Sequence, residues 1–290
     1  MSKIQADLHL HTTFSDGTLT PTQMVALCVE RGLTTICISD HDTTNGLPET
    51  FAAAEAYPDL TVIPGIELST DVPGGEIHIL GYFVDHYDES LQVILDDFRM
   101  GRENRGFGMV QKLNELGIDV SWERVQEIAG DAPIGRPHIA QALVEGGYVK
   151  YPKDAFDEYL GRDGLAYVER PKLLPVDAVR LLVAHGALAV MAHPTYSSSK
   201  SDRGEVDSLD EILTELKEAG LVGMEVYYGD YTPEQVEWLR GLAEKFDLIP
   251  LGGSDYHALG NPGEPEPGTV GPPMSSVEAL FEMHAATSAQ

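Results

Sequence analysis

The sequence predicts an α/β domain that is interrupted by a helical insertion. Short apolar runs, suited to buried strands, alternate with helical segments before residue 90 and again after residue 175. Between them, residues 90–174 show helical periodicity and no convincing strand signal. At 290 residues with 42% hydrophobic content, the chain suits one large α/β domain or such a domain with an insertion.

The segment before residue 90 begins with a strand, a helix and a second strand, which is a βαβ unit. Pro21 is tolerated in the first turn of its helix, and Gly32 is a natural stop. A turn at 72–75 makes the last two strands of this part antiparallel. The expected elements here are strands at 4–8, 34–39, 60–69 and 76–82 and helices at 21–32 and 48–56.

The rest of the chain is assigned by the same patterns, which give a barrel domain at 1–90 and 175–265 and a substrate-capping helical subdomain at 91–174. A tail at 266–290 carries a short helix near 277–283. The insertion is expected to hold a helix that ends at Gly117 and further helices at 121–129, 137–146 and 154–160. After it come helices at 175–185, 207–219 and 232–246 and strands at 186–192, 221–227 and 248–253.

The charge of the chain is strongly acidic, with 47 acidic and 19 basic residues and a net charge of −28. Capture of long DNA or RNA needs a basic surface, so a general nucleic-acid groove is not expected. Cys28 and Cys37 lie in apolar runs and are interpreted as buried free thiols. With no signal peptide and no apolar run near the ~20 residues that span a bilayer, a soluble cytoplasmic protein without membrane contact is expected.

Two histidines stand two residues apart directly after the expected strand at 4–8. Because side chains at i and i+2 project from one face of a strand, His9 and His11 aim two imidazoles at one point. Asp16 follows in a polar turn that ends in Gly17. Imidazole and carboxylate are the usual ligands of zinc, manganese and iron. By itself, the pair is also compatible with two histidines that have no function. The prediction of a metal site therefore depends on further ligands at other strand ends.

Histidines and carboxylates recur where other expected strands end, which is where α/β folds carry their chemistry. Glu67 stands in an apolar run, where a buried unpaired carboxylate is costly and needs a cation or a strong donor. As alternatives, His78 could be a structural histidine of the core, and Asp42 could cap a helix. The full set of candidates, nine residues, exceeds what one ion binds, so two or three metals are expected. These candidates are His9, His11, Asp16, His41, Glu67, His78, His193, Asp255 and His257.

The insertion concentrates arginines in a chain that is poor in basic residues. Arg102 and Arg105 share a helix face at i and i+3. In Gly135-Arg136-Pro137-His138, the proline suits a helix first turn, so Arg136 and the free helix amides form an anion site. Arginine binds phosphate through a bidentate fork. The alternative is that these arginines pair with surface acids.

Several motifs in order along residues 4–258 are similar to those of the PHP (polymerase and histidinol phosphatase) family of metal-dependent phosphoesterases. They are Asp7-Leu8-His9-Leu10-His11, Ser15-Asp16-Gly17, Ser39-Asp40-His41-Asp42, Gly65-Ile66-Glu67, Ile77-His78-Ile79-Leu80-Gly81-Tyr82, Ala192-His193-Pro194 and Gly253-Ser254-Asp255-Tyr256-His257. The resemblance implies a distorted (βα)7 TIM-like barrel with a three-metal site. By analogy, His9, His11, Glu67 and Asp255 hold the first metal, Glu67, His78 and His193 the second, and Asp16, His41 and His257 the third.

The resemblance also implies an activity, the hydrolysis of a phosphate ester with two or three Mn, Zn or Fe ions as cofactors. The insertion is similar to that of the subgroup acting on nucleoside 3′,5′-bisphosphates, with release of the 3′-phosphate, or trimming short oligoribonucleotides from the 5′ end. The implied nucleophile is a metal-bridging hydroxide held by Glu67, His9, His11, His193 and Asp255. The expected substrate contacts are Arg102, Arg105, Arg136 and His138.

Three alternatives stay open from the sequence. His138 also suits a capping or packing role in its own helix. The same metals also suit a cyclic phosphate diester or another small phosphomonoester. A different class, a metal-binding module without turnover, is disfavoured by the complete ligand set and the spare arginines. The group that protonates the leaving oxygen is not identified.

Overall fold

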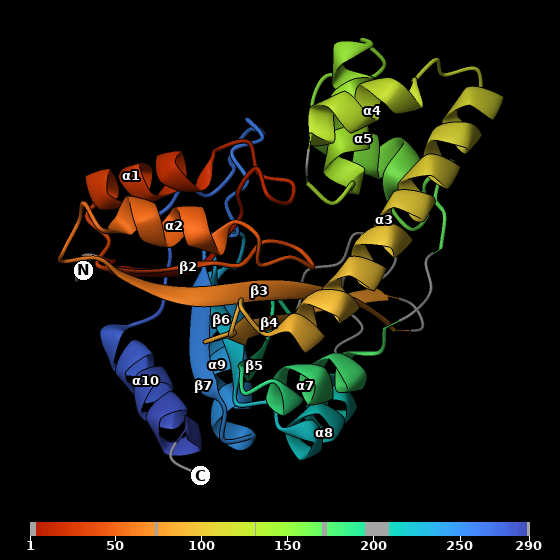
Figure 1. Cartoon of the computed structure of the whole chain (residues 1–290). Coiled ribbons are helices and arrows are strands. Elements are labelled where there is room, and N and C mark those ends of the chain that lie inside the picture. The colour runs from red at the N-terminus through yellow and green to blue at the C-terminus, as the bar shows by residue number, and fades with distance from the viewer. Residues whose placement is uncertain (1–3, 73–74, 131, 170–172, 195–208, 289–290) are drawn as a thin grey trace.

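A computed structural model of the chain contains seven strands that follow one another around a nearly closed barrel in the order of the sequence (Figure 1). The structure describes residues 4–72, 75–130, 132–169, 173–194 and 209–288. The strands are β1 (Ala6–Leu10), β2 (Thr35–Ile38), β3 (Thr61–Val72), β4 (Gly75–Tyr82), β5 (Leu188–Met191), β6 (Gly223–Tyr228) and β7 (Ile249–Gly253).

The barrel is distorted because one strand runs against its neighbours. β1, β2 and β3 pair in parallel, as do β5, β6 and β7, whereas β4 is antiparallel to both β3 and β5. This confirms the antiparallel pairing expected from the turn at 72–75. Because β4 is reversed, its N-terminal half lies at the end of the barrel where the parallel strands have their C-termini. His78 of β4 therefore pairs with Ser69, near the C-terminus of β3.

Hydrogen bonds between the ends of β1 and β7 bring the first and last strands together. The Asp7 carboxylate accepts from the backbone N–H of Ser254 at 2.9 Å. The N–H of Asp255 donates to the carbonyl of His9 at 2.9 Å, and the N–H of His11 donates to the carbonyl of Tyr256 at 3.1 Å. These bonds hold the segment after β7 directly beside the histidine pair.

The closure depends on a glycine at the end of β7. A Cβ on Gly253 would lie 2.5 Å from the His9 nitrogen and 2.7 Å from an Asp7 carboxylate oxygen. We therefore expect Gly253→Ala to lower the free energy of unfolding by about 1–3 kcal/mol, the usual cost of overpacking. Urea denaturation checks this. Gly241→Ala is the control, because a Cβ there meets nothing within 4 Å; equal stability of both variants would contradict the prediction.

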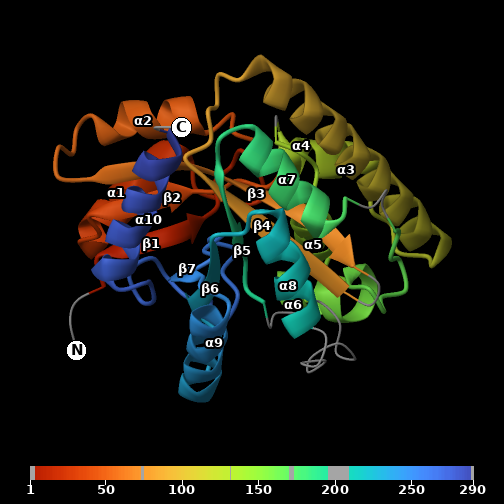
Figure 2. The ribbon, with the colours of Figure 1, turned by 90° about the horizontal axis from the view of Figure 1, so that it is seen from below.

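Helices cover the outside of the strands, with α1 and α2 on one side and α7 and α8 on another (Figure 2). The predicted ends of the first helix are confirmed: Thr20 forms a capping box with Gln23, and Gly32 adopts a left-handed φ of 80°. The tail helix is longer than the short one expected near 277–283, since Val277 and Leu280 pack against the barrel. These helices are α1 (Pro21–Arg31), α2 (Leu47–Ala54), α7 (Pro175–Ala184), α8 (Leu209–Ala219), α9 (Pro233–Lys245) and α10 (Met274–Ser288).

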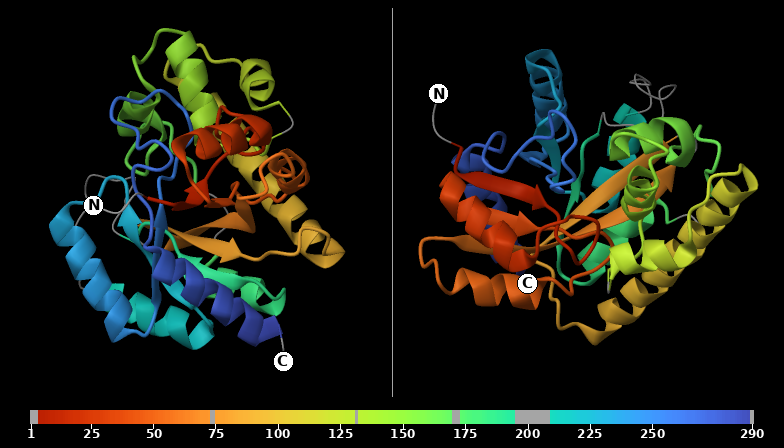
Figure 3. Two further views of the ribbon diagram at one scale, coloured as in Figure 1. Left: turned by 90° about the vertical axis from the view of Figure 1, so that its left-hand side faces the viewer. Right: turned by 90° about the horizontal axis from the view of Figure 1, so that it is seen from above.

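The helical insertion forms a body of its own beside the barrel (Figures 1 and 3). Its first helix, α3 (Glu89–Glu115), is one continuous helix of 27 residues that leads from the barrel to the other helices. The segment expected at 154–160 is divided between a short helix and a π-helical turn at Phe156–Leu160. The others are α4 (Trp122–Ala129), α5 (Arg136–Glu145) and α6 (Pro152–Ala155). Buried side chains from these helices, such as Leu113 and Leu143, make a separate hydrophobic core.

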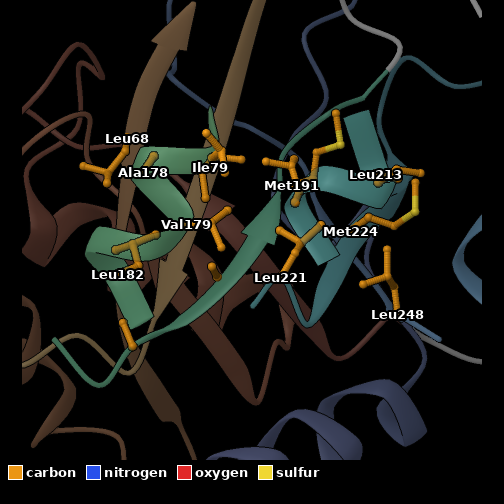
Figure 4. Close-up of a cluster of buried hydrophobic side chains, with 14 of the residues drawn as sticks. Leu68, Ile79, Ala178, Val179, Leu182, Met191, Leu213, Leu221, Met224 and Leu248 are labelled. Carbon is orange, nitrogen blue, oxygen red and sulfur yellow. The ribbon is translucent and has the colours of Figure 1, made fainter. Parts of the chain in front are cut away.

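Side chains alternate in direction along β3 and β4, so one face of these strands packs in the hydrophobic core and the other faces the site. Leu68 of β3 pairs with Ile79 of β4, and both pack against Val179 and Leu182 of α7 (Figure 4). Since successive side chains of a strand point to opposite faces, the neighbours Glu67 and His78 point to the inside of the barrel. Packing of the apolar face against α7 therefore aims the polar face at the site. No helix in the described part of the chain is long and apolar enough to cross a membrane.

Candidate metal centre

All nine candidate ligands lie at one end of the barrel, in or just after its strands. Most belong to three overlapping groups in which one ligand atom per residue lies within 4.8 Å of the others. The groups are His9, His11, Glu67 and Asp255; His11, Asp16, His41 and His257; and His41, Glu67 and His78. The ninth residue, His193, joins them because its Nε2 lies 3.1 Å from a Glu67 carboxylate oxygen.

Glu67 is the centre of the cluster and is fully buried. Five histidine nitrogens lie 2.8–3.2 Å from its two oxygens. Those near Oε2 are His9 Nε2, His11 Nε2 and His41 Nδ1, and those near Oε1 are His78 Nδ1 and His193 Nε2. A carboxylate whose two oxygens face separate sets of imidazoles has the arrangement of a bridging ligand between two ions.

Two aspartates complete the neighbouring groups. Asp255 Oδ1 lies 3.2 Å from His9 Nε2 and 3.1 Å from His11 Nε2. Asp16 Oδ1 lies 3.3 Å from His257 Nε2, and its Oδ2 lies 3.6 Å from His41 Nε2. The three groups therefore sit side by side rather than as separate sites.

Buried polar atoms test whether this cluster fits cations. His9 Nε2, His11 Nε2, Glu67 Oε2 and Asp16 Oδ1 are buried and make no hydrogen bond. Leaving such atoms unsatisfied costs about 1–3 kcal/mol each, more when charged. Imidazole nitrogens and carboxylate oxygens facing one another satisfy their lone pairs by binding a cation between them. The cluster therefore fits divalent metal ions.

The charges of the cluster are set by its own members. Burial disfavours the ionised form of Glu67, yet the facing His41, His9 and His78 hold its pKa well below the usual range. For His257, burial lowers the pKa, but the adjacent Asp16 outweighs it and raises the pKa to about 10. The carboxylate thus stays ionised as a ligand, while an incoming metal ion must displace the proton of His257.

A carboxylate that sequence reasoning did not single out supports the histidines from behind. Glu225 of β6 is fully buried. One of its oxygens lies 3.1 Å from His9 Nδ1, and the other accepts from the backbone N–H of His193 at 2.7 Å. With its proton on Nδ1, His9 presents the lone pair of Nε2 to a metal. The signal that identified Glu67, an acid inside an apolar strand, was also present for Glu225.

We expect Glu225→Gln to weaken metal binding roughly 10- to 100-fold, the usual effect of losing a partner behind a ligand. The amide has one oxygen for the two donors that Glu225 serves, at His9 and His193. Calorimetric titration of the metal-free protein with Mn²⁺ measures the affinity. Glu237→Gln, which removes an exposed partner of Arg240, is the control. Equal affinity in the two variants would show that Glu225 does not orient the ligands.

Other aspartates shape the loops that carry the ligands. Asp40 accepts from the N–H and hydroxyl of Thr12, both at 2.7 Å, and from the Ser15 hydroxyl at 2.6 Å, next to Asp16. The interpretation of Asp42 as a helix cap is wrong, because the residue at the N-cap of α2 is Gly46. Asp42 instead accepts from the N–H of Ser69 at 3.0 Å and pairs with Arg102. This pair ties the insertion to the rim of the metal site.

Six described residues other than glycine have a positive φ, and these include three in the segments that carry the cluster. Asp42, His193 and Asp255 have positive φ values of 54°, 23° and 55°. For residues other than glycine such angles cost of order 1–3 kcal/mol and persist where the surroundings impose them. Two of the three are candidate ligands, which supports a functional constraint on the strand ends.

A cavity of about 530 Å³ opens above the cluster, and the insertion forms one of its walls. Arg102, Arg105 and Arg136 all line it. Arg102 binds Asp42 and the Ser69 hydroxyl, whereas Arg105 Nε donates to the carbonyl of Val168 at 2.8 Å. The guanidinium of Arg136 lies over the ring of Phe156, 5.4 Å from its centroid.

His138 has a different position. Its side chain is buried, and Nδ1 accepts from the backbone N–H of Gly135 at 3.0 Å. This is the capping role at the start of α5 that the sequence also allowed. Burial lowers the pKa of His138, which favours the neutral ring that accepts this bond.

A nearly closed seven-stranded barrel with a shared histidine and carboxylate cluster at its strand ends defines a metal-binding α/β-barrel protein. The chain belongs to the PHP domain family, whose family model matches residues 7–160. The resemblance drawn from the sequence motifs is thereby confirmed.

Relatives match along most of the chain. A 5′-3′ exoribonuclease of Haemophilus influenzae is 32% identical over 87% of this chain and 89% of its own length. A 3′,5′-nucleoside bisphosphate phosphatase of Chromobacterium violaceum is 31% identical over 89% of this chain and 88% of its own. The crystal structure of a presumed metal-dependent phosphoesterase from Bifidobacterium adolescentis superposes with a TM-score of 0.85 at 30% identity, covering 96% of each chain.

Proposed function

We propose that this protein is a metal-dependent phosphoesterase that removes the 3′-phosphate from nucleoside 3′,5′-bisphosphates or trims short oligoribonucleotides from the 5′ end. The observation that carries the proposal is the buried cluster of nine ligand-type side chains at the base of a cavity with an arginine-lined wall. Relatives named as a nucleoside bisphosphate phosphatase and a 5′-3′ exoribonuclease support the choice of substrate.

The first ligand set coincides with one group of the cluster, the third is drawn from a second group, and the second joins Glu67 and His78 to His193, which lies outside the groups. Glu67, which faces a different set of imidazoles with each oxygen, would be shared by two of the ions, and a third would lie close to them because His11 and His41 each belong to two groups. We assign the first ion to His9, His11, Glu67 and Asp255, the second to Glu67, His78 and His193, and the third to Asp16, His41 and His257. Two or three ions of Mn, Zn or Fe suit these ligands.

When bound, such ions lower the pKa of a coordinated water and neutralise the oxygens of the phosphoryl group. The remaining work belongs to the protein. Arg102 and Arg136 hold phosphate oxygens on the insertion wall, and Arg105 adds positive charge beside them. Glu225 keeps His9 in the ligating tautomer, and the cavity wall formed by the insertion positions the scissile bond over the cluster.

The cavity also limits the size of the substrate. A volume of about 530 Å³ suits a ligand the size of a nucleotide. The backbone N–H of Lys153, in the insertion, donates to Asn261 Oδ1 at 3.3 Å and joins the two walls of the cavity. A chain with a net charge of −28 has no general attraction for long nucleic acids. We infer that substrates enter by one end, one nucleotide at a time.

Phosphate release from a panel of substrates tests the proposal. The panel holds adenosine 3′,5′-bisphosphate, short RNA, a cyclic nucleotide, a sugar phosphate and an aryl phosphate, each with Mn²⁺ and with a chelator. We expect the bisphosphate and the short RNA to be preferred, and chelation to abolish turnover. Negligible rates that are equal in the wild type and in His193→Ala would point instead to a metal-binding module without turnover, and preference for the cyclic substrate would favour a diesterase.

A further inference from the structure

The two walls of the cavity differ in chemistry. The insertion wall carries its basic groups, Arg102, Arg105, Arg136 and Lys153. Among the described residues that line the opposite wall there is no lysine or arginine, and His257 belongs to the metal cluster, with its Nε2 3.3 Å from Asp16 Oδ1. Those residues come from the end of β6 and the turn that follows it, from the start of α9 and from the segment after β7, and they include Tyr228, Tyr231, Gln235, Leu259 and Asn261. A phosphate therefore belongs on the first wall, and an uncharged flat group suits the second.

Two tyrosines in contact with each other line the opposite wall. Tyr228 is 8% exposed, and its hydroxyl donates to Asp255 Oδ2 at 3.0 Å, beside the metal cluster. The ring of Tyr231 packs against the ring of Tyr228, with centroids 5.0 Å apart and planes inclined by 49°. Tyr228 is thereby held at both ends, and Tyr231 lies one aromatic ring farther from the cluster, with part of its surface in the cavity.

The aromatic ring on the insertion wall has another role. The guanidinium of Arg136 covers a face of Phe156. Phe156 thus supports a phosphate-binding side chain, whereas Tyr231 packs against another aromatic ring, that of Tyr228. The Arg136–Phe156 contact and the Tyr228–Tyr231 pair lie on different walls and suit different parts of a ligand.

Beyond the metal cluster, the described residues of the opposite wall include two acids, Asp230 and Glu264, and the loop after β7 uses the second. Glu264 accepts from the backbone N–H groups of His257, Leu259 and Gly260 at 3.0–3.2 Å. The side-chain oxygens of Gln235 and Asn261 also accept backbone N–H groups, from Thr232 and Lys153. What these two carboxamides have left to offer a ligand is therefore the donor NH₂ group.

We propose that Tyr231, backed by Tyr228, is the platform on which the nucleobase of the substrate stacks, while the insertion arginines hold its phosphates. This inference rests on the proposed function and deepens it by assigning base recognition to the wall opposite the insertion. Stacking is tolerant of base identity, since every base has a π face, and it contributes about 1–3 kcal/mol per base. The ligand class is thus a nucleotide of any base, with NH₂ donors available to the base edge.

Binding measurements test the platform apart from turnover. Calorimetry compares adenosine 5′-monophosphate with ribose 5-phosphate, which lacks the base, on the Mn²⁺-loaded protein. We expect the wild type to bind the nucleotide roughly 10- to 100-fold more tightly. Tyr231→Ala should remove this preference without weakening ribose 5-phosphate, and Tyr231→Phe should retain it. Tyr87→Ala, at a tyrosine that is 77% exposed and does not line the cavity, is the control.

The outcomes separate the two proposals. A preference that persists in Tyr231→Ala, or an equal loss of both ligands, would overturn the platform. If Tyr231-dependent binding is found but the wild type releases no phosphate from adenosine 3′,5′-bisphosphate, the platform stands and the proposed activity falls. If phosphate is released from the bisphosphate and from its abasic analogue with equal kcat/KM, the activity stands and the platform falls.

Discussion

Replacing Glu67 by glutamine is expected to lower kcat/KM for phosphate release by at least about a thousand-fold, because charge stabilisation by the metals is worth several kcal/mol. Both oxygens of Glu67 face histidine nitrogens at 2.8–3.2 Å. The amide keeps one neutral oxygen and turns an NH₂ group toward the other set of ligands. Since we assign Glu67 to two ions, both would lose an anionic ligand at once, and we therefore expect a larger loss than for any single histidine.

Metal content distinguishes this cause from a simple folding defect. Elemental analysis of Glu67→Gln after dialysis should show fewer metal ions per chain than the wild type, while circular dichroism should show the same secondary structure. Glu211→Gln, in the first turn of α8, is the control and should retain both metal and activity. Full metal content with full activity in Glu67→Gln would refute the bridging role.

Removing the guanidinium of Arg136 is expected to produce the second largest effect. A hydrogen bond to a charged group contributes about 1.5–3 kcal/mol, so Arg136→Ala should raise KM for adenosine 3′,5′-bisphosphate roughly 10- to 150-fold. Arg136 begins α5, and its position over Phe156 keeps the planar group at the wall of the cavity. Hydrolysis of an aryl monophosphate should change much less, because that substrate has no second phosphate to hold.

Steady-state kinetics on the two substrates measure this difference. Arg136→Lys should recover part of the loss, since lysine keeps the charge but not the bidentate fork. Arg180→Ala, on the exposed surface of α7, is the matched control. An unchanged KM for the bisphosphate in Arg136→Ala would mean that the insertion does not bind the second phosphate.

Much of the site could be predicted because it obeys local rules. His9 and His11 share a strand face by their spacing alone, and parallel strands deliver their carboxyl ends to one edge. Glu67 could be predicted because burying a lone, unpaired carboxylate inside an apolar strand costs free energy. The turn at 72–75 indicated the reversed strand β4, and the loss of strand signal marked the insertion.

The supporting residues could not be assigned in the same way. Glu225 has the same sequence signal as Glu67, but its partner His9 lies 216 residues earlier in the chain. The sequence around Asp42 predicts a helix cap, and only the packing of α3 on the barrel reveals Arg102 as its partner. Tyr228 and Tyr231, on the cavity wall opposite the insertion, belong to no sequence motif that predicts a binding site. Their role follows only from the fold, which places the insertion across the cavity from them.

The sequence by itself determined which residues can bind metal and at which strand ends they stand, because periodicity and residue chemistry are local properties. The tertiary structure decided how they are shared: Glu67 between two sets of histidines, Glu225 behind His9, and the closing of β1 on β7 that brings Asp255 to them. These relations depend on contacts between segments far apart in the chain. Such contacts are set by how the strands curve into a barrel, which no short stretch of sequence specifies.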